Sequence, residues 1–348
     1  MQAKEKNYRL RFGVIGVGIQ GEKHVKILST HPLVEVVSIC DVNPERLKEV
    51  SQKYGINKTY IDYEEMLAKE RLDAVVVATP DHLHLKPVIS ALENGINVLL
   101  EKPMATKLDD ALKMAEEAKK RGLLLYINFS NRFNPPFAIA HKKFREGELG
   151  KPLYAYFRLS DTIYVPTKML SWASKSSVVF FLMSHTTDLA RWIFNDEVRK
   201  VRAYAHYEVL ESLGIRTPDY VTAVLEFRKG GRVVLESSWI LPETLPSIVD
   251  FNMEIIGTRG AIYINNTFQS IAVANATRHY YPKPIVLEEV NGRFTGFVKE
   301  SIFHFVDSLA SKTEPLIKVK DGVENTRVLE AIVESYTRNT EIVLEENR

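Results

Sequence analysis

The sequence predicts an α/β domain followed by an α+β domain, and three observations support this. Short, continuously apolar runs alternate with helix-like segments up to residue 128, which predicts an N-terminal Rossmann-type, doubly wound parallel sheet. After residue 130, alternating apolar and polar residues predict a C-terminal, mainly antiparallel open sheet with helices on one face. The length of 348 residues suits two domains. We expect them at residues 1–128 and 129–348.

The elements of the first domain follow from this alternation. The expected strands are residues 10–15, 34–40, 73–78, 96–100 and 123–127. The expected helices are residues 22–29, 45–54, 63–70, 84–93 and 108–121. Gly55, Gly95 and Gly122 each follow one of these helices. Glycine commonly ends a helix because it adopts the left-handed backbone conformation without strain.

The second domain has more strands than its helices can cover. The expected strands are residues 153–159, 201–209, 221–227, 233–240, 252–256 and 261–264. We expect hairpin turns at residues 229–231 and 257–260, and helices at residues 178–194 and 325–340. Two helices leave one face of the sheet free. We therefore expect a homodimer or homotetramer that buries that face.

A glycine-rich loop joins the first expected strand to the first helix. Gly16, Gly18 and Gly21 match the G-x-G-x-x-G fingerprint of dinucleotide-binding folds. In this fingerprint the first glycine allows a tight turn, the second allows pyrophosphate to approach the backbone, and the third allows close packing of helix and strand. The helix N-terminus, beginning with Ile19 and Gln20, supplies free N–H groups for the phosphates. The loop predicts a dinucleotide site.

Asp41 follows the second expected strand and bears on which dinucleotide binds. A carboxylate at this position can accept both ribose hydroxyls of the adenosine and repels a 2′-phosphate. The first basic residue after Asp41 is Arg46. NAD is therefore favoured over NADP. The alternative is that Asp41 only caps the following helix, although Asn43 before Pro44 is itself a good cap.

Polar segments follow three further strands, and ligands of doubly wound sheets bind at these strand ends. The segments are Thr79-Pro80-Asp81-His82-Leu83-His84, Glu101-Lys102-Pro103 and Asn128-Phe129-Ser130-Asn131-Arg132. With GVIGVGIQG, ATPDHLH, NVLLEKPMA, NFSNRFNP and SHTTD, the chain resembles the glucose–fructose oxidoreductase/inositol dehydrogenase family over nearly its whole length. The resemblance implies an NAD(P)-dependent dehydrogenase or reductase that transfers hydride between nicotinamide and a sugar, polyol or sugar derivative.

The resemblance and the chemistry agree on Lys102. Oxidation of a secondary alcohol needs a group that takes the hydroxyl proton while hydride leaves for nicotinamide. A lysine partly desolvated beside an oxidised nicotinamide is expected to have a lowered pKa, which suits this task. The alternative is that Lys102 only holds the cofactor. We expect the cofactor to contact Gly16, Gly18, Ile19, Gln20, Gly21, Asp41, Thr79, Pro80, His82, His84, Glu101, Lys102, Asn128 and Arg132.

His185 is the second catalytic candidate, with a substrate-orienting or relay role. In the family a D-x-x-x-H pattern sets an aspartate and a histidine against the substrate, but this chain has Phe181 in place of the aspartate. Asp188, one turn beyond His185, is the candidate replacement. Trp172 is a further candidate because aromatic rings suit the apolar faces of sugars. The alternative is that His185 is an ordinary helix histidine.

The remaining polar residues can be interpreted either as ligand-binding residues or as ordinary structural ones. His82 and His84 could bind a metal, but no carboxylate or thiolate cluster accompanies them, so we expect packing near the nucleotide and no metal site. Arg132 could bind a cofactor or substrate oxygen, or could be a surface arginine.

Composition excludes several classes of partner. The 46 basic and 44 acidic residues are mixed along the chain, so we expect no nucleic-acid or membrane partner. A single cysteine, Cys40, fits a reducing compartment, and the charged N-terminal segment has no apolar signal region. We expect a cytoplasmic enzyme.

Two rival functions remain open at this point. One is a redox-neutral hydrolase or epimerase that uses NAD transiently. The other is a cofactor-bound, non-catalytic sensor or scaffold, which the phenylalanine at position 181 suggests.

Overall fold

The computed structural model describes residues 9–345, and these form two compact units. The first unit contains residues up to Ala105, Asp109–Asn128 and Lys299–Val323. The second contains Thr106–Leu108, Phe129–Val298 and the residues from Glu324 onward. Among the described helices, none is long and apolar enough to cross a membrane.

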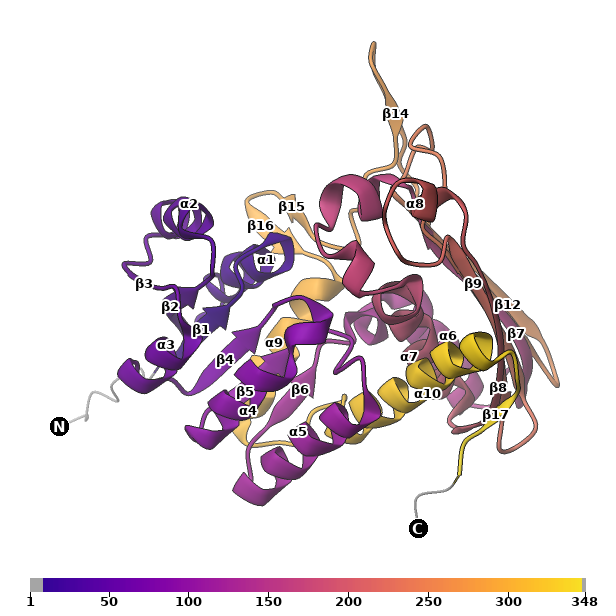
Figure 1. Ribbon diagram of the computed structural model, residues 1–348, viewed down its shortest axis with the longest axis horizontal. Helices are drawn as coiled ribbons and strands as arrows, with labels where there is room; N and C mark the ends of the chain where they lie inside the picture. The colour runs from indigo at the N-terminus through magenta and orange to yellow at the C-terminus, as the bar shows by residue number, and fades with distance from the viewer. Residues whose placement is uncertain (1–8, 346–348) are drawn as a thin grey trace. The chain divides into compact units, whose positions relative to one another are not determined.

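The first unit is built on a six-stranded parallel sheet of order β3-β2-β1-β4-β5-β6, the Rossmann order (Figure 1). Its strands are β1 Leu10–Ile15, β2 Val34–Cys40, β3 Lys58–Tyr60, β4 Ala74–Val77, β5 Asn97–Leu100 and β6 Leu125–Ile127. Its helices are α1 Ile19–Leu28, α2 Pro44–Tyr54, α3 Tyr63–Lys69, α4 Leu85–Glu93, α5 Leu108–Arg121 and most of α9 Phe297–Ser311. β4 is buried throughout, as expected of a strand covered on both faces.

Helix α9 joins the first unit although it comes late in the chain. The sequence predicts residues 299–323 in the second domain, whereas in the structure they belong to the unit that contains the parallel sheet. The reason is packing: the Phe305 ring lies 6.1 Å from that of Phe12 and 5.5 Å from that of Tyr126. The Tyr126 hydroxyl also hydrogen-bonds the Ser301 hydroxyl at 3.0 Å. These contacts join residues at least 175 positions apart in the chain, which local sequence patterns do not reveal.

The second unit contains a seven-stranded sheet of order β12-β11-β7-β10-β9-β8-β17. Its strands are β7 Pro152–Asp161, β8 Val198–His206, β9 Tyr220–Phe227, β10 Arg232–Ser238, β11 Val249–Gly257, β12 Ala261–Asn265 and β17 Ile342–Val343. Of its strand pairs, β7 with β10 is parallel and the others are antiparallel. Two small hairpins complete its strands: β13 Val273–Ala274 with β14 His279–Tyr280, and β15 Glu288–Val290 with β16 Arg293–Thr295.

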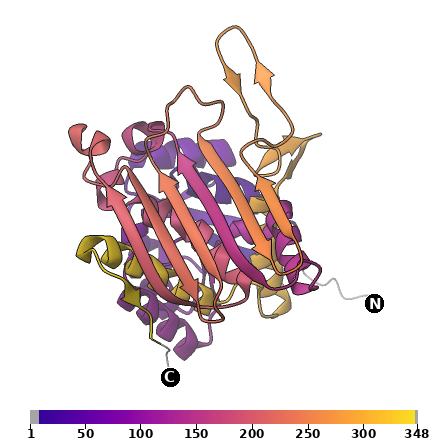
Figure 2. The same ribbon diagram turned by 90° about the vertical axis from the view of Figure 1, so that its right-hand side faces the viewer.

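One face of this sheet carries the core of the second unit. The helices of the unit are α6 Pro135–Arg145, α7 Ser184–Phe194, α8 Val209–Ser212 and α10 Val319–Arg338, whose first residues to Val323 count with the first unit. Alternate residues of β9 and β10 are fully buried against apolar side chains of α6, α7 and α10. The opposite face is turned toward the viewer in Figure 2, where no described helix crosses in front of the strands.

The structure confirms the predicted fold class and departs from several expected elements. The strand β3 and the helices α6 and α9 are additional to the expected elements, and β3 is a short, largely exposed strand at the edge of its sheet. The expected helix at residues 178–194 is a π-helical turn, Val179–Met183, followed by α7. The strand expected at residues 201–209 is shifted to Val198–His206.

Candidate functional site

The glycine-rich loop has the geometry that a dinucleotide site requires. Gly16 has φ of +82°, and a Cβ on it would lie 2.7 Å from the carbonyl oxygen of Ala78. A Cβ on Gly21 would lie 1.7 Å from the carbonyl oxygen of Gly16, so only glycine allows α1 to pack this closely. Gly18 has no heavy atom within 4 Å of its Cβ position. Packing within the protein therefore does not require glycine at position 18. The open space beside it fits a pyrophosphate at the N-terminus of α1.

Asp41 connects the glycine-rich loop to the start of α2. Its Oδ2 accepts a hydrogen bond from the Val17 N–H at 2.8 Å, and its Oδ1 accepts one from the Asn43 N–H at 2.9 Å. The N-cap of α2 is Asn43, whose side chain accepts from the N–H groups of Glu45 and Arg46. Asp41 therefore does not cap the helix. Its half-buried carboxylate keeps further lone pairs for ribose hydroxyls.

His84 connects two of the predicted loops of the first unit. The ring is buried, with Nδ1 at 2.9 Å from the Pro103 carbonyl oxygen and Nε2 at 3.0 Å from the Thr79 carbonyl oxygen. Burial lowers the pKa of His84, which favours a neutral ring that donates to one of these carbonyls. His84 thus ties the loop after β4 to the segment that contains Lys102.

Glu101, the neighbour of Lys102, lies in a chain of hydrogen bonds. Its Oε1 accepts from His24 Nε2 at 2.6 Å and from Asn128 Nδ2 at 2.8 Å, and Asn128 Oδ1 accepts from the Ser301 hydroxyl at 2.8 Å. Although burial alone would raise it, the hydrogen bond and charge of His24 lower the pKa of Glu101 to about 2. Glu101 is therefore ionised at neutral pH. His24 and Ser301, which lie outside the sequence motifs, support the segment that presents Lys102.

The second unit holds His185 in a defined orientation. His185 lies in the first turn of α7, and the Asn131 side chain approaches its Nδ1 at 3.1 Å. When the Asn131 amide donates to Nδ1, the neutral ring carries its proton on Nε2. Asn131 was not a sequence candidate. It lies within the NFSNRFNP segment, but its pairing with a residue 54 positions away appears only in the structure.

Arg132 and Asp188 form a buried pair in the second unit. Arg132 Nε and Nη2 donate to the two carboxylate oxygens of Asp188 at 3.0 and 2.6 Å. The two side chains are 4% and 1% exposed. Removing one partner of such a buried pair strongly destabilises the protein, because the other charge is left buried and unpaired. The carboxylate of Asp188 is thus bound by Arg132, and the predicted ligand roles of both residues stay predictions.

Phe181 belongs to an aromatic cluster in the second unit. Its ring centroid lies 6.2 Å from that of Trp172 and 5.7 Å from that of Trp239. Phe181 and Trp172 are half-buried, whereas Trp239 is fully buried. Phe181 lies on the π-helical turn that precedes α7. Such turns are frequent at functional sites, so the cluster is a candidate wall for an apolar substrate face.

Comparison with known proteins identifies the family. Residues 10–129 match the model of the oxidoreductase family with an NAD-binding Rossmann fold, and residues 137–263 match the GFO/IDH/MocA C-terminal domain. The chain belongs to the Gfo/Idh/MocA family of oxidoreductases. The predictions of the family, of NAD as cofactor and of an NAD-dependent oxidoreductase are confirmed.

Three similar proteins illustrate this Gfo/Idh/MocA relationship. The scyllo-inositol 2-dehydrogenase (NAD(+)) of Bacillus subtilis is 27% identical over 347 residues, covering 98% of each chain. The myo-inositol 2-dehydrogenase of Thermotoga maritima is 29% identical over 322 residues, covering 90% of this chain and 92% of that protein. The crystal structure of myo-inositol 2-dehydrogenase from Lactobacillus plantarum superposes with a TM-score of 0.85 at 21% identity, covering 97% of this chain and all of that one.

Proposed function

We propose that this oxidoreductase oxidises a secondary hydroxyl of an inositol-class cyclic polyol. The support is the agreement between full-length relatives named as inositol dehydrogenases and a Rossmann unit with Lys102 at the carboxyl end of β5. Bound NAD would supply the acceptor for a hydride from the carbinol carbon. Neutral Lys102 takes the hydroxyl proton and becomes an ammonium ion. The carbinol carbon loses the hydride and the hydroxyl loses its proton, so the product is a ketone.

His185 is the substrate-positioning residue in this proposal. With its proton on Nε2, the neutral ring donates a hydrogen bond to a polyol oxygen while Asn131 holds Nδ1. Gly16, Gly18, Gly21 and Asp41 bind the cofactor, and Thr79, Pro80 and Glu101 form the adjoining loops. We also propose that the cofactor contacts Ile19, Gln20, His82 and His84. The remaining cofactor contacts are those of Asn128 and Arg132.

The test is a steady-state assay of NADH formation with myo-inositol, scyllo-inositol and a panel of aldoses. We expect turnover to be fastest with one of the inositols. Product formation without net NADH would instead indicate the redox-neutral hydrolase or epimerase. Tight NAD binding without turnover on any member of the panel would indicate the sensor or scaffold.

Assembly and location complete the proposal. We infer a homodimer or homotetramer, because the free sheet face carries exposed Tyr154, Tyr204 and Tyr263. A cytoplasmic location is supported by Cys40, the single cysteine, which is buried and free. Burial raises the pKa of this thiol to about 12, so it is not a reactive thiolate.

A further inference from the structure

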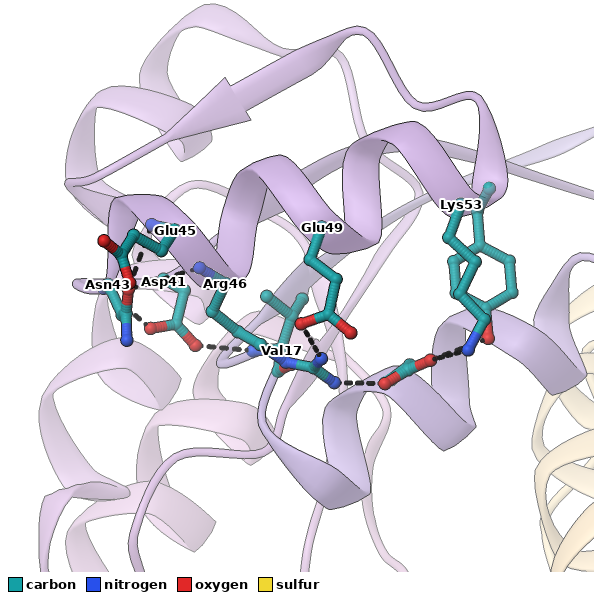
Figure 3. A network of polar contacts seen from close by, with 9 residues as sticks. Val17, Asp41, Asn43, Glu45, Arg46, Glu49 and Lys53 are labelled. Atoms are coloured by element: carbon teal, nitrogen blue, oxygen red, sulfur yellow. Dashed lines mark hydrogen bonds and ion pairs between the residues drawn. The ribbon is translucent and has the colours of Figure 1, made fainter.

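Arg46 lies in the first turn of α2, close in sequence to Asp41, but its guanidinium is engaged elsewhere. Figure 3 shows the side chain running along α2, with the guanidinium beside Val17 and Glu49. Nε donates to the Val17 carbonyl oxygen at 2.8 Å, and Nη1 donates to Glu49 at 2.6 Å. Nη2 donates to Glu22 on α1. All three kinds of guanidinium nitrogen thus have an acceptor.

Glu22 is the centre of this network. Besides Arg46, it accepts hydrogen bonds from Lys53 Nζ at 2.7 Å and from the Tyr54 hydroxyl at 3.1 Å. Although partial burial would raise it, the hydrogen bonds from Lys53, Arg46 and Tyr54 lower the pKa of Glu22 to about 2. The Glu22 and Arg46 side chains are only 19% and 22% exposed, whereas Glu49 is 61% exposed. Glu22 is therefore the more buried of the two carboxylates that bind Arg46.

The location of this network bears on cofactor choice. A 2′-phosphate on the adenosine ribose would lie at the end of β2, beside Asp41, where NADP-binding members of such folds use an arginine. Arg46 is the first basic residue after Asp41 and is the natural cation for that purpose. In the observed conformation its charge is balanced by two carboxylates, and its Nε braces the glycine-rich loop through Val17.

We propose that Glu22 is a specificity-determining residue of the NAD site, because it holds Arg46 against the glycine-rich loop and away from a 2′-phosphate. Selectivity for NAD then has two parts. Asp41 repels the 2′-phosphate directly, and Glu22 withholds the cation that would attract it. This inference rests on NAD binding alone and is independent of which polyol is the substrate.

The test compares dissociation constants for NAD and NADP, measured by calorimetry on the full chain. We expect Asp41→Ser to lower the ratio of the NADP constant to the NAD constant. Adding Glu22→Gln should lower this ratio by about a further tenfold, since a freed guanidinium gains a charge-assisted contact with the phosphate. In an Asp41→Ser/Arg46→Met background the same Glu22→Gln change should have no effect on the ratio.

Two further variants test whether the change in the ratio is specific to the carboxylates that bind Arg46. Glu65→Gln removes a carboxylate of the same unit that pairs with Lys69 and should leave the ratio unchanged in the Asp41→Ser background. Glu49 is the more exposed of the two carboxylates that bind Arg46, so Glu49→Gln should lower the ratio less than Glu22→Gln does. If Glu22→Gln fails to fold, Glu49→Gln takes its place in the test. The proposal is overturned if freeing Arg46 leaves the ratio unchanged. It is also overturned if Glu65→Gln gives an equal change, or if the change persists without Arg46.

Discussion

Lys102 has fixed neighbours on both sides of its backbone. Glu101 is held by His24 and Asn128, and the Pro103 carbonyl oxygen is held by His84. These hydrogen bonds are made by Glu101 and by the Pro103 carbonyl oxygen, on either side of Lys102. Truncating that side chain should therefore remove its chemistry while leaving the segment in place.

We predict that Lys102→Ala lowers kcat by about a hundred- to ten-thousand-fold, the usual loss of a general acid–base group. The variant should still fold and bind NAD, as shown by its melting temperature and by calorimetry. Lys120→Ala is the control, because Lys120 is an exposed lysine on α5 of the same unit. Turnover of Lys102→Ala within a few-fold of the parent would contradict the assignment.

At the scale of elements, the sequence predicts what is locally encoded. The glycine fingerprint and Asp41 lie within about thirty residues, so their geometry follows from one strand–helix–strand unit. The engagement of Arg46 by Glu22 depends on how α1 packs beside α2, and the pairing of Asn131 with His185 joins segments 54 residues apart. Hydrophobic periodicity carries no information on such side-chain pairs, so these parts of the site required the structure.

The π-helical turn before α7 carries Phe181 one turn ahead of His185, and this arrangement gives a pH prediction. In Phe181→Asp, a carboxylate on the neighbouring turn should favour the protonated imidazolium and raise the pKa of His185. Because the proposal requires the neutral ring, the rise of kcat/KM with pH should then move to higher pH. Profiles of parent and variant on one substrate test this.

Phe181→Leu is the matched control for this experiment. It removes the aromatic ring without adding a charge, so its profile should keep the pH midpoint of the parent. Superimposable profiles for Phe181→Asp and the parent, or a shift of the variant to lower pH, would show that Phe181 does not act on the titrating group.

At the scale of the whole molecule, the free face of the seven-stranded sheet predicts self-association. Residues that alternate with the buried ones on β9, β7 and β11 include Val224, Tyr154 and Ile256, which are 36%, 43% and 46% exposed. Apolar side chains gathered on one sheet face are typical of an interface, and a twofold dimer presents the same patch from both copies. A charge placed at the middle of that face would enter such an interface twice.

We therefore predict that Val224→Lys shifts the oligomer toward smaller species, because the lysine must be desolvated without a partner. Light scattering at micromolar concentration measures this directly. The control is Ile139→Lys on α6, since Ile139 is also exposed, at 52%, but lies outside the sheet. A monomeric parent at that concentration, or equal dissociation by both substitutions, would contradict an assembly built on the sheet face.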